Sequence, residues 1–165
     1  MKEGLTVDPM RDAIPHMRMG TSVAWTLLAL VAGCRGKLVA TADLRGPGTT
    51  EVALSGTGAR LEVWADYDAK WKGPKSSKPV LEYDIEVLKK GEKVGSVHCS
   101  TMKPGSTSVC GSHSNVMGEH DADCESNLAC KLPAEAEGSV TLRVTGTLGK
   151  NVLSTKKMSL NFREP

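Results

Sequence analysis

Apolar and polar residues alternate with a period of two through most of the chain beyond residue 37. Such alternation is typical of β-strands that bury one face, and this part of the chain shows no helical periodicity. Turn-forming residues, chiefly glycine and proline, separate the alternating segments. We predict seven or eight strands, over residues 38–44, 51–55, 61–67, 80–90, 93–100, 128–132, 139–148 and 154–163.

One apolar face per strand predicts two sheets that pack face to face and bury these faces together. The expected fold is all-β: an antiparallel β-sandwich, immunoglobulin-like, with a single domain over residues 34–165. A small closed barrel has the same strand pattern and is the alternative. Residues 70–79 and 101–127 interrupt the alternation, so both are expected to be loops, the second of them long.

Four cysteines lie in or beside the expected long loop: Cys99, Cys110, Cys124 and Cys130. They allow three disulfide connectivities. We favour Cys99–Cys130 at the base of the loop with Cys110–Cys124 nested inside it, because the outer two cysteines belong to consecutive predicted strands. Sequential pairing, Cys99–Cys110 with Cys124–Cys130, is the alternative. Two disulfides indicate an oxidising compartment such as the periplasm or the cell exterior.

A short apolar run, residues 23–34, precedes the expected domain and ends in Val31-Ala32-Gly33-Cys34. Its core of about ten residues is too short for a membrane-spanning helix, which needs about 20. The four closing residues resemble the lipobox of bacterial lipoprotein precursors. The resemblance implies a signal peptide over residues 1–33, cleavage before Cys34 and a lipid on the Cys34 thiol. A lipid on Cys34 also accounts for the odd number of cysteines.

The segment upstream of the apolar run carries as many acidic as basic residues, whereas a signal peptide begins with a positive charge. A start at Met17 removes the acidic residues, so we expect Met17 to be the true first residue. The resemblance further implies a location in the bacterial cell envelope. Arg35 follows the cysteine where an aspartate tends to retain lipoproteins in the inner membrane, which favours the outer membrane.

The formal net charge of +2 is too small to indicate a nucleic-acid partner. No phosphate-binding or dinucleotide-binding glycine motif occurs, and we expect no cofactor. The long loop holds the weak metal-ligand candidates: His113, His120, Asp121 and Asp123. Imidazole and carboxylate groups suit divalent metals, but these spacings match no known metal motif. We therefore expect a solvated loop, assign no catalytic residue, and keep a metal site as the alternative.

Trp64 and Trp71 are the candidate ligand surface, because aromatic side chains beside polar groups are typical of sites that bind sugars or peptides. The alternative is that Trp64 is partly covered and Trp71 caps one end of the core. The sequence thus predicts a lipid-anchored envelope protein that acts as a non-enzymatic binding or assembly module. Its expected partners are the membrane and an envelope protein or glycan. A periplasmic metal-dependent protein or enzyme that uses residues 98–125 is the alternative.

Overall fold

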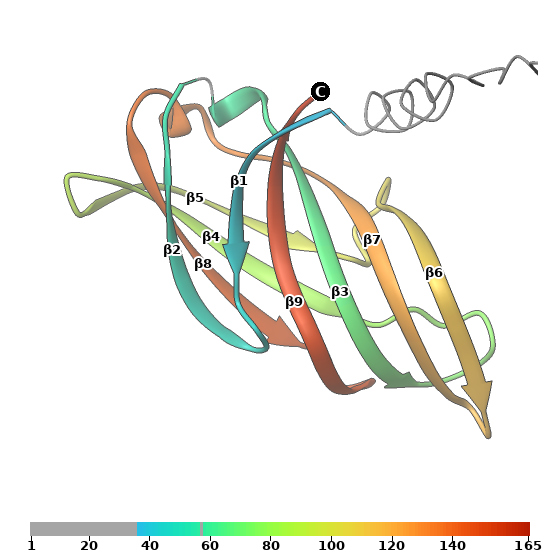
Figure 1. The fold of residues 1–165 in the computed structure, drawn as a ribbon. Helices are drawn as coiled ribbons and strands as arrows, with labels where there is room; N and C mark the ends of the chain where they lie inside the picture. The colour runs from blue at the N-terminus through green and yellow to red at the C-terminus, as the bar shows by residue number, and fades with distance from the viewer. Residues whose placement is uncertain (1–35, 57) are drawn as a thin grey trace, which may run out of the picture.

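The computed structural model describes residues 36–56 and 58–165, in which nine strands form two antiparallel sheets (Figure 1). The predicted signal peptide, the Met17 start and Cys34 lie outside the described residues. The strands are β1 (Lys37–Asp43), β2 (Gly48–Leu54), β3 (Glu62–Lys72), β4 (Leu81–Lys89), β5 (Glu92–Ser100), β6 (Thr107–Val116), β7 (Glu119–Lys131), β8 (Val140–Leu148) and β9 (Val152–Glu164). Two single-turn 3₁₀ helices, η1 (Gly58–Arg60) and η2 (Ala134–Ala136), complete the described secondary structure.

The five-stranded sheet has the order β1-β9-β3-β7-β6, and the four-stranded sheet has the order β2-β8-β4-β5. The neighbouring strands β6, β7 and β3 match strands D, E and B of an immunoglobulin domain, and β4 and β8 match C and F. The flanking strands differ: the last strand, β9, lies beside β3, and the early strand β2 lies beside β8. The predicted antiparallel sandwich is therefore confirmed, with an immunoglobulin-like order of its central strands.

The core lies between the two sheets and is built from the inward faces that the alternation predicts. On β3, for example, Val63, Ala65 and Tyr67 are fully buried, while Trp64 and Asp66 on the other face are partly exposed. Large buried side chains of the four-stranded sheet meet them from β4 and β8, among them Tyr83, Ile85 and Leu142. Burial of such residues contributes about 1.5–3 kcal/mol for each large apolar side chain.

The expected loop over residues 101–127 is wrong: most of it is a hairpin of β6 and β7. Strand β7 does alternate, with His120, Ala122, Cys124 and Ser126 buried and the residues between them on the other face. The inward residues are small or polar, so the alternation carries no hydrophobic signal. The expected loop over residues 70–79 also begins too early, because β3 continues to Lys72.

Both predicted disulfides form with the nested connectivity. Cys99–Cys130 joins β5 of one sheet to β7 of the other, with a Cα–Cα distance of 5.8 Å. Cys110–Cys124 joins β6 to β7 within the five-stranded sheet, with a Cα–Cα distance of 4.1 Å. The first bond ties the two layers together, and the second fastens an edge strand to its neighbour.

Within residues 36–56 and 58–165, no helix has the length and hydropathy needed to span a membrane.

Candidate binding surface

Trp71 belongs to the core, so it adds nothing to an exposed ligand surface. Its side chain is only 3% exposed, and its indole N–H donates to the Ser77 carbonyl oxygen at 3.2 Å. The indole stacks on the imidazole of His120, with ring centroids 5.1 Å apart. Of the two alternatives for Trp71, the structure supports the one in which it caps an end of the core.

The metal-ligand candidates on β7 lie on opposite faces of the sheet. His120 faces the core, with its Nε2 3.1 Å from the Gly73 carbonyl oxygen. Because a carbonyl only accepts, Nε2 carries the proton and Nδ1 accepts from Asn115, 3.2 Å away. Asp121 and Asp123 lie on the outer face, since the side chains of a strand alternate between faces.

No group of three or more His, Cys, Asp or Glu side chains that could hold a metal ion occurs among the described residues. The side chain of His113 is not described, although its backbone belongs to β6 opposite Ala122. The expectation that the long loop, residues 101–127, is solvated fails for His120, which is buried.

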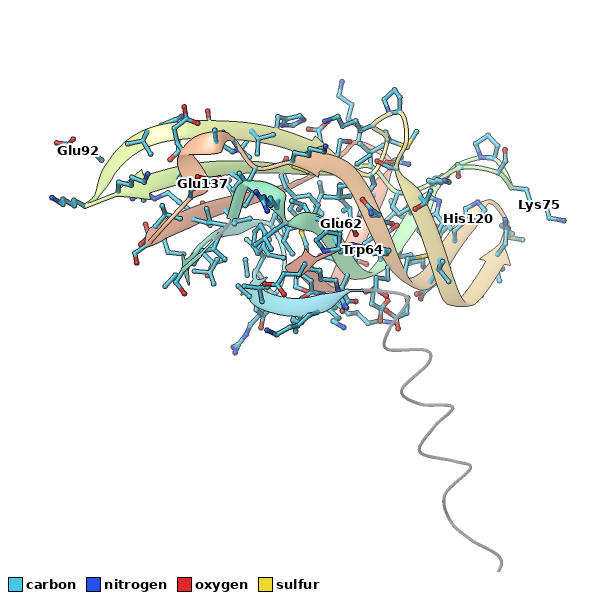
Figure 2. The ribbon with its side chains drawn as sticks, turned by 90° about the horizontal axis from the view of Figure 1, so that it is seen from above. Glu62, Trp64, Lys75, Glu92, His120 and Glu137 are labelled. Atoms are coloured by element: carbon cyan, nitrogen blue, oxygen red, sulfur yellow. A yellow bond between two sulfur atoms is a disulfide. The ribbon has the colours of Figure 1, made fainter. Side chains whose placement is uncertain are left out.

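Trp64 lies half-buried on the outer face of the five-stranded sheet. Its indole N–H donates to Glu62 Oε2 at 2.9 Å, and the side-chain amide of Asn127 approaches the same oxygen at 3.4 Å. Figure 2 shows Trp64 and Glu62 next to each other, away from His120. Glu62 and Asn127 also line a cleft of about 800 Å³ that Arg60 and Lys131 border. Trp64 is therefore partly covered and held by its polar neighbours.

Ion pairs lie on the same outer face of the sheet. Lys157 Nζ lies 2.7 Å from Asp66 Oδ2, and Arg163 Nη2 lies 3.0 Å from Glu125 Oε1. The hydrogen bond to Asp66 raises the pKa of Lys157, and the nearby negative charge adds to the effect. A shallow depression of about 370 Å³ lies among these charges, with Asp123 on its rim. Alternating signs along neighbouring strands stabilise the sheet surface and leave little net charge for steering an ionic ligand.

The β6–β7 hairpin is the surface that sequence analysis missed. Strand β6 is the last of the five-stranded sheet and pairs only with β7 among the described strands. Val109 on β6 is 66% exposed, and at the hairpin turn Val116 is 68% and Met117 98% exposed. Most large apolar side chains of a folded protein are buried, so their exposure needs an explanation. A cluster of exposed apolar side chains is typical of a surface that contacts a partner. Figure 1 shows the hairpin at one side of the sandwich, with its turn far from the C-terminus.

A signal for this hairpin does exist in the sequence. From Pro104 to Gly118 no residue is Asp, Glu, Lys or Arg, although the chain as a whole is 24% charged. An uncharged segment at the surface of a protein is unusual, because exposed strands generally carry charges that prevent association. Residues 104–118 therefore stand out in the sequence as an uncharged segment.

No protein-family model, no curated protein and no solved structure matches this chain.

Proposed function

We propose that this chain is a lipid-anchored protein of a bacterial cell envelope, and that its sandwich is a non-enzymatic binding or assembly module. The observation that supports the second part is the β6–β7 hairpin. It presents an uncharged edge strand together with an apolar tip formed by Val116 and Met117. Placing such side chains in water has a free-energy cost that a partner would relieve, at about 25 cal/mol per Å² of apolar area covered.

The position of the N-terminus gives the anchored domain a definite orientation. Cys34 precedes Gly36 by two residues, which span at most about 7 Å of extended chain. Gly36 packs against the carbonyl group of Glu164, so a lipid on Cys34 would hold this end of the sandwich at the membrane. The hairpin tip lies at the opposite end of the five-stranded sheet, as Figure 1 shows. An anchored domain would therefore direct Met117 away from the lipid surface, towards envelope proteins or glycan.

Site-specific photo-crosslinking in intact cells tests this proposal. A photoreactive residue at position 117 should give a discrete adduct, while the same residue at Lys90, in the exposed β4–β5 turn, should not. A Val116→Asp substitution should remove the adduct, because a carboxylate would have to be desolvated in the contact. Equal background labelling at positions 117 and 90 would refute a role for the hairpin in binding.

A further inference from the structure

We infer that β6 is a self-association strand: its free edge pairs antiparallel with β6 of a second copy of this chain, about a twofold axis near Val109. The inference rests on the second part of the proposed function, the binding or assembly module, since it names the partner of the hairpin. The described residues of β6 support it, and so does the difference between β6 and the other edge strands.

Three of the four sheet edges are protected. Strands β1 and β2, each at the edge of its own sheet, lie against one another and close one side of the sandwich. Strand β5 packs against β7 and is fastened to it through Cys99–Cys130. These edge strands also carry charged residues, including Lys37 on β1, Glu51 on β2 and Lys93 on β5. Such charges are a usual means of preventing edge-to-edge pairing.

Among the described residues, no strand pairs with the outer edge of β6. Residues of β6 are exposed on both faces, and the strand contains no Asp, Glu, Lys or Arg. When a strand pairs antiparallel with its own copy, a charge near the twofold axis comes close to the same charge of the other copy. An uncharged strand avoids that repulsion, and this electrostatic self-compatibility favours a second copy over a charged partner.

The backbone of β6 is arranged for such pairing. Cys110 and Cys124 are cross-strand partners only 4.1 Å apart at Cα, the short spacing of a non-hydrogen-bonded pair. The N–H and C=O groups of Cys110 therefore point away from β7 to the free edge, and those of Ser108, two residues earlier, do the same. These groups are the donors and acceptors that another strand would use.

Pairing about a twofold axis at Val109 gives all of these backbone N–H and C=O groups a hydrogen-bond partner. Ser108 of each copy then exchanges hydrogen bonds with Cys110 of the other. Val109, whose own backbone groups face β7, forms a close non-hydrogen-bonded pair with Val109 of the second copy, and its exposed side chain is covered. A register shift between Cys110 and His113 ends the regular strand, which limits the pairing to residues 107–111.

Such a dimer is closed and weak in free solution. Each copy uses the same edge, so the association stops at two copies and does not extend into a fibre. Five paired residues bury much less surface than a stable interface of about 1,200–2,000 Å². The twofold axis reverses one copy relative to the other, so the Gly36 ends of the two domains lie at opposite ends of the dimer.

A charge-swap experiment at Val109 tests the inference. Sedimentation equilibrium of the whole chain in detergent should show a monomer–dimer equilibrium for the wild type. Val109→Glu and Val109→Lys should each raise the dissociation constant at least tenfold, because like charges then face each other at the axis. An equimolar mixture of the two variants should form a heterodimer, which shows that both variants are folded. Val94→Glu, a matched change of a 39% exposed valine on edge strand β5, should leave the equilibrium unchanged.

The outcomes separate this inference from the proposed function. A wild-type chain that stays monomeric at about 1 mM, or variants that dimerise like the wild type, would overturn self-association through β6. If position 117 still crosslinks to a different protein, the binding module stands and only the second copy is refuted. Dimerisation through Val109 in a protein that carries no lipid on Cys34 would support the β6 interface and refute the proposed lipid anchor.

Discussion

Trp71 and His120 stack in the core with their ring planes 10° apart, one residue on β3 and its cross-strand partner on β7. The pair fills the end of the sandwich near the Gly73–Pro79 segment, to which both side chains are hydrogen-bonded. An aromatic pair of this kind contributes about 0.5–1.5 kcal/mol beyond the burial of its area. The two residues that most suggest a ligand site from sequence therefore stabilise the fold.

We expect Trp71→Ala to lower the free energy of unfolding by about 3–5 kcal/mol, as for other buried aromatic residues. Trp64→Ala, on the same strand but half-buried on the outer face, is the matched control and should cost less than about 2 kcal/mol. Urea unfolding followed by circular dichroism measures both values. Equal losses for the two variants would contradict the assignment of Trp71 to the core.

The two disulfides should differ in their resistance to reduction. Cys99 and Cys130 are both buried, whereas Cys110 is on the exposed edge strand. Because a thiolate must reach a sulfur atom to reduce the bond, a mild reductant should open Cys110–Cys124 first. Alkylation at timed intervals and mass spectrometry identify the order, and faster labelling of Cys99 would contradict it.

Loss of each disulfide should also affect stability differently. A Cys99→Ala/Cys130→Ala variant loses the link across a 31-residue separation, and chain entropy predicts a loss of about 3–4 kcal/mol. A Cys110→Ala/Cys124→Ala variant loses a link across a separation of only 14 and should lose at most about 3 kcal/mol. A larger loss from the edge-strand pair in urea unfolding would show that β6 stabilises the whole sandwich.

Most of the architecture follows from the sequence, because a strand that buries one face must alternate. The β4–β5 hairpin and strands β8 and β9 are confirmed, since residues such as Val140, Leu142 and Val144 leave no other way to bury an apolar face. The nested disulfides are confirmed for a related reason: Cys99 and Cys130 end strands that face each other across the core. Local pattern was sufficient wherever the inward residues were hydrophobic.

The β6–β7 hairpin and the candidate site could not be predicted in the same way. On β7 the inward positions hold His120, Ala122, Cys124 and Ser126. These residues are small or polar, so the sequence alone predicts a polar loop. The burial of His120 depends on Trp71, a residue distant in sequence, so the sequence showed only an imidazole beside the carboxylates of Asp121 and Asp123, a weak metal-ligand candidate. Burial that depends on a tertiary partner leaves no periodic signal in the chain.

Two surface ion pairs predict that stability depends on pH. The Lys70 ammonium, 2.7 Å from Glu119, lowers the pKa of that carboxyl group by hydrogen bonding, and Lys93 does the same for Glu86 at 2.8 Å. A lowered folded-state pKa adds stability that is complete above the unfolded value of 4.5 and is lost as pH falls through the folded pKa. We therefore expect the urea midpoint to fall below about pH 4.5.

A Glu86→Gln/Glu119→Gln variant should show a shallower fall of the urea midpoint below that pH, because neither amide can take up a proton. Glu137→Gln, an exposed change on the segment after η2, is the control and should keep the wild-type profile. An unchanged slope in the double variant would mean that other groups govern the acid response. The pKa of Lys70 is raised by the same contact, so its contribution should be lost only at alkaline pH, as pH rises through that raised value.

Lipidation of Cys34 is the prediction on which the orientation of the domain depends. Mass spectrometry of the mature N-terminus should show cleavage before Cys34 and the added mass of acyl chains, and Cys34→Ser should remove both and release the protein from the membrane fraction. Arg35→Ser is a suitable control, because it leaves the cysteine intact and should preserve the lipid. An unmodified Cys34 would leave the sandwich free to turn, and the apolar tip at Met117 would then have no preferred direction. With the lipid present, the short span to Gly36 fixes that end at the bilayer and directs the hairpin tip away from it.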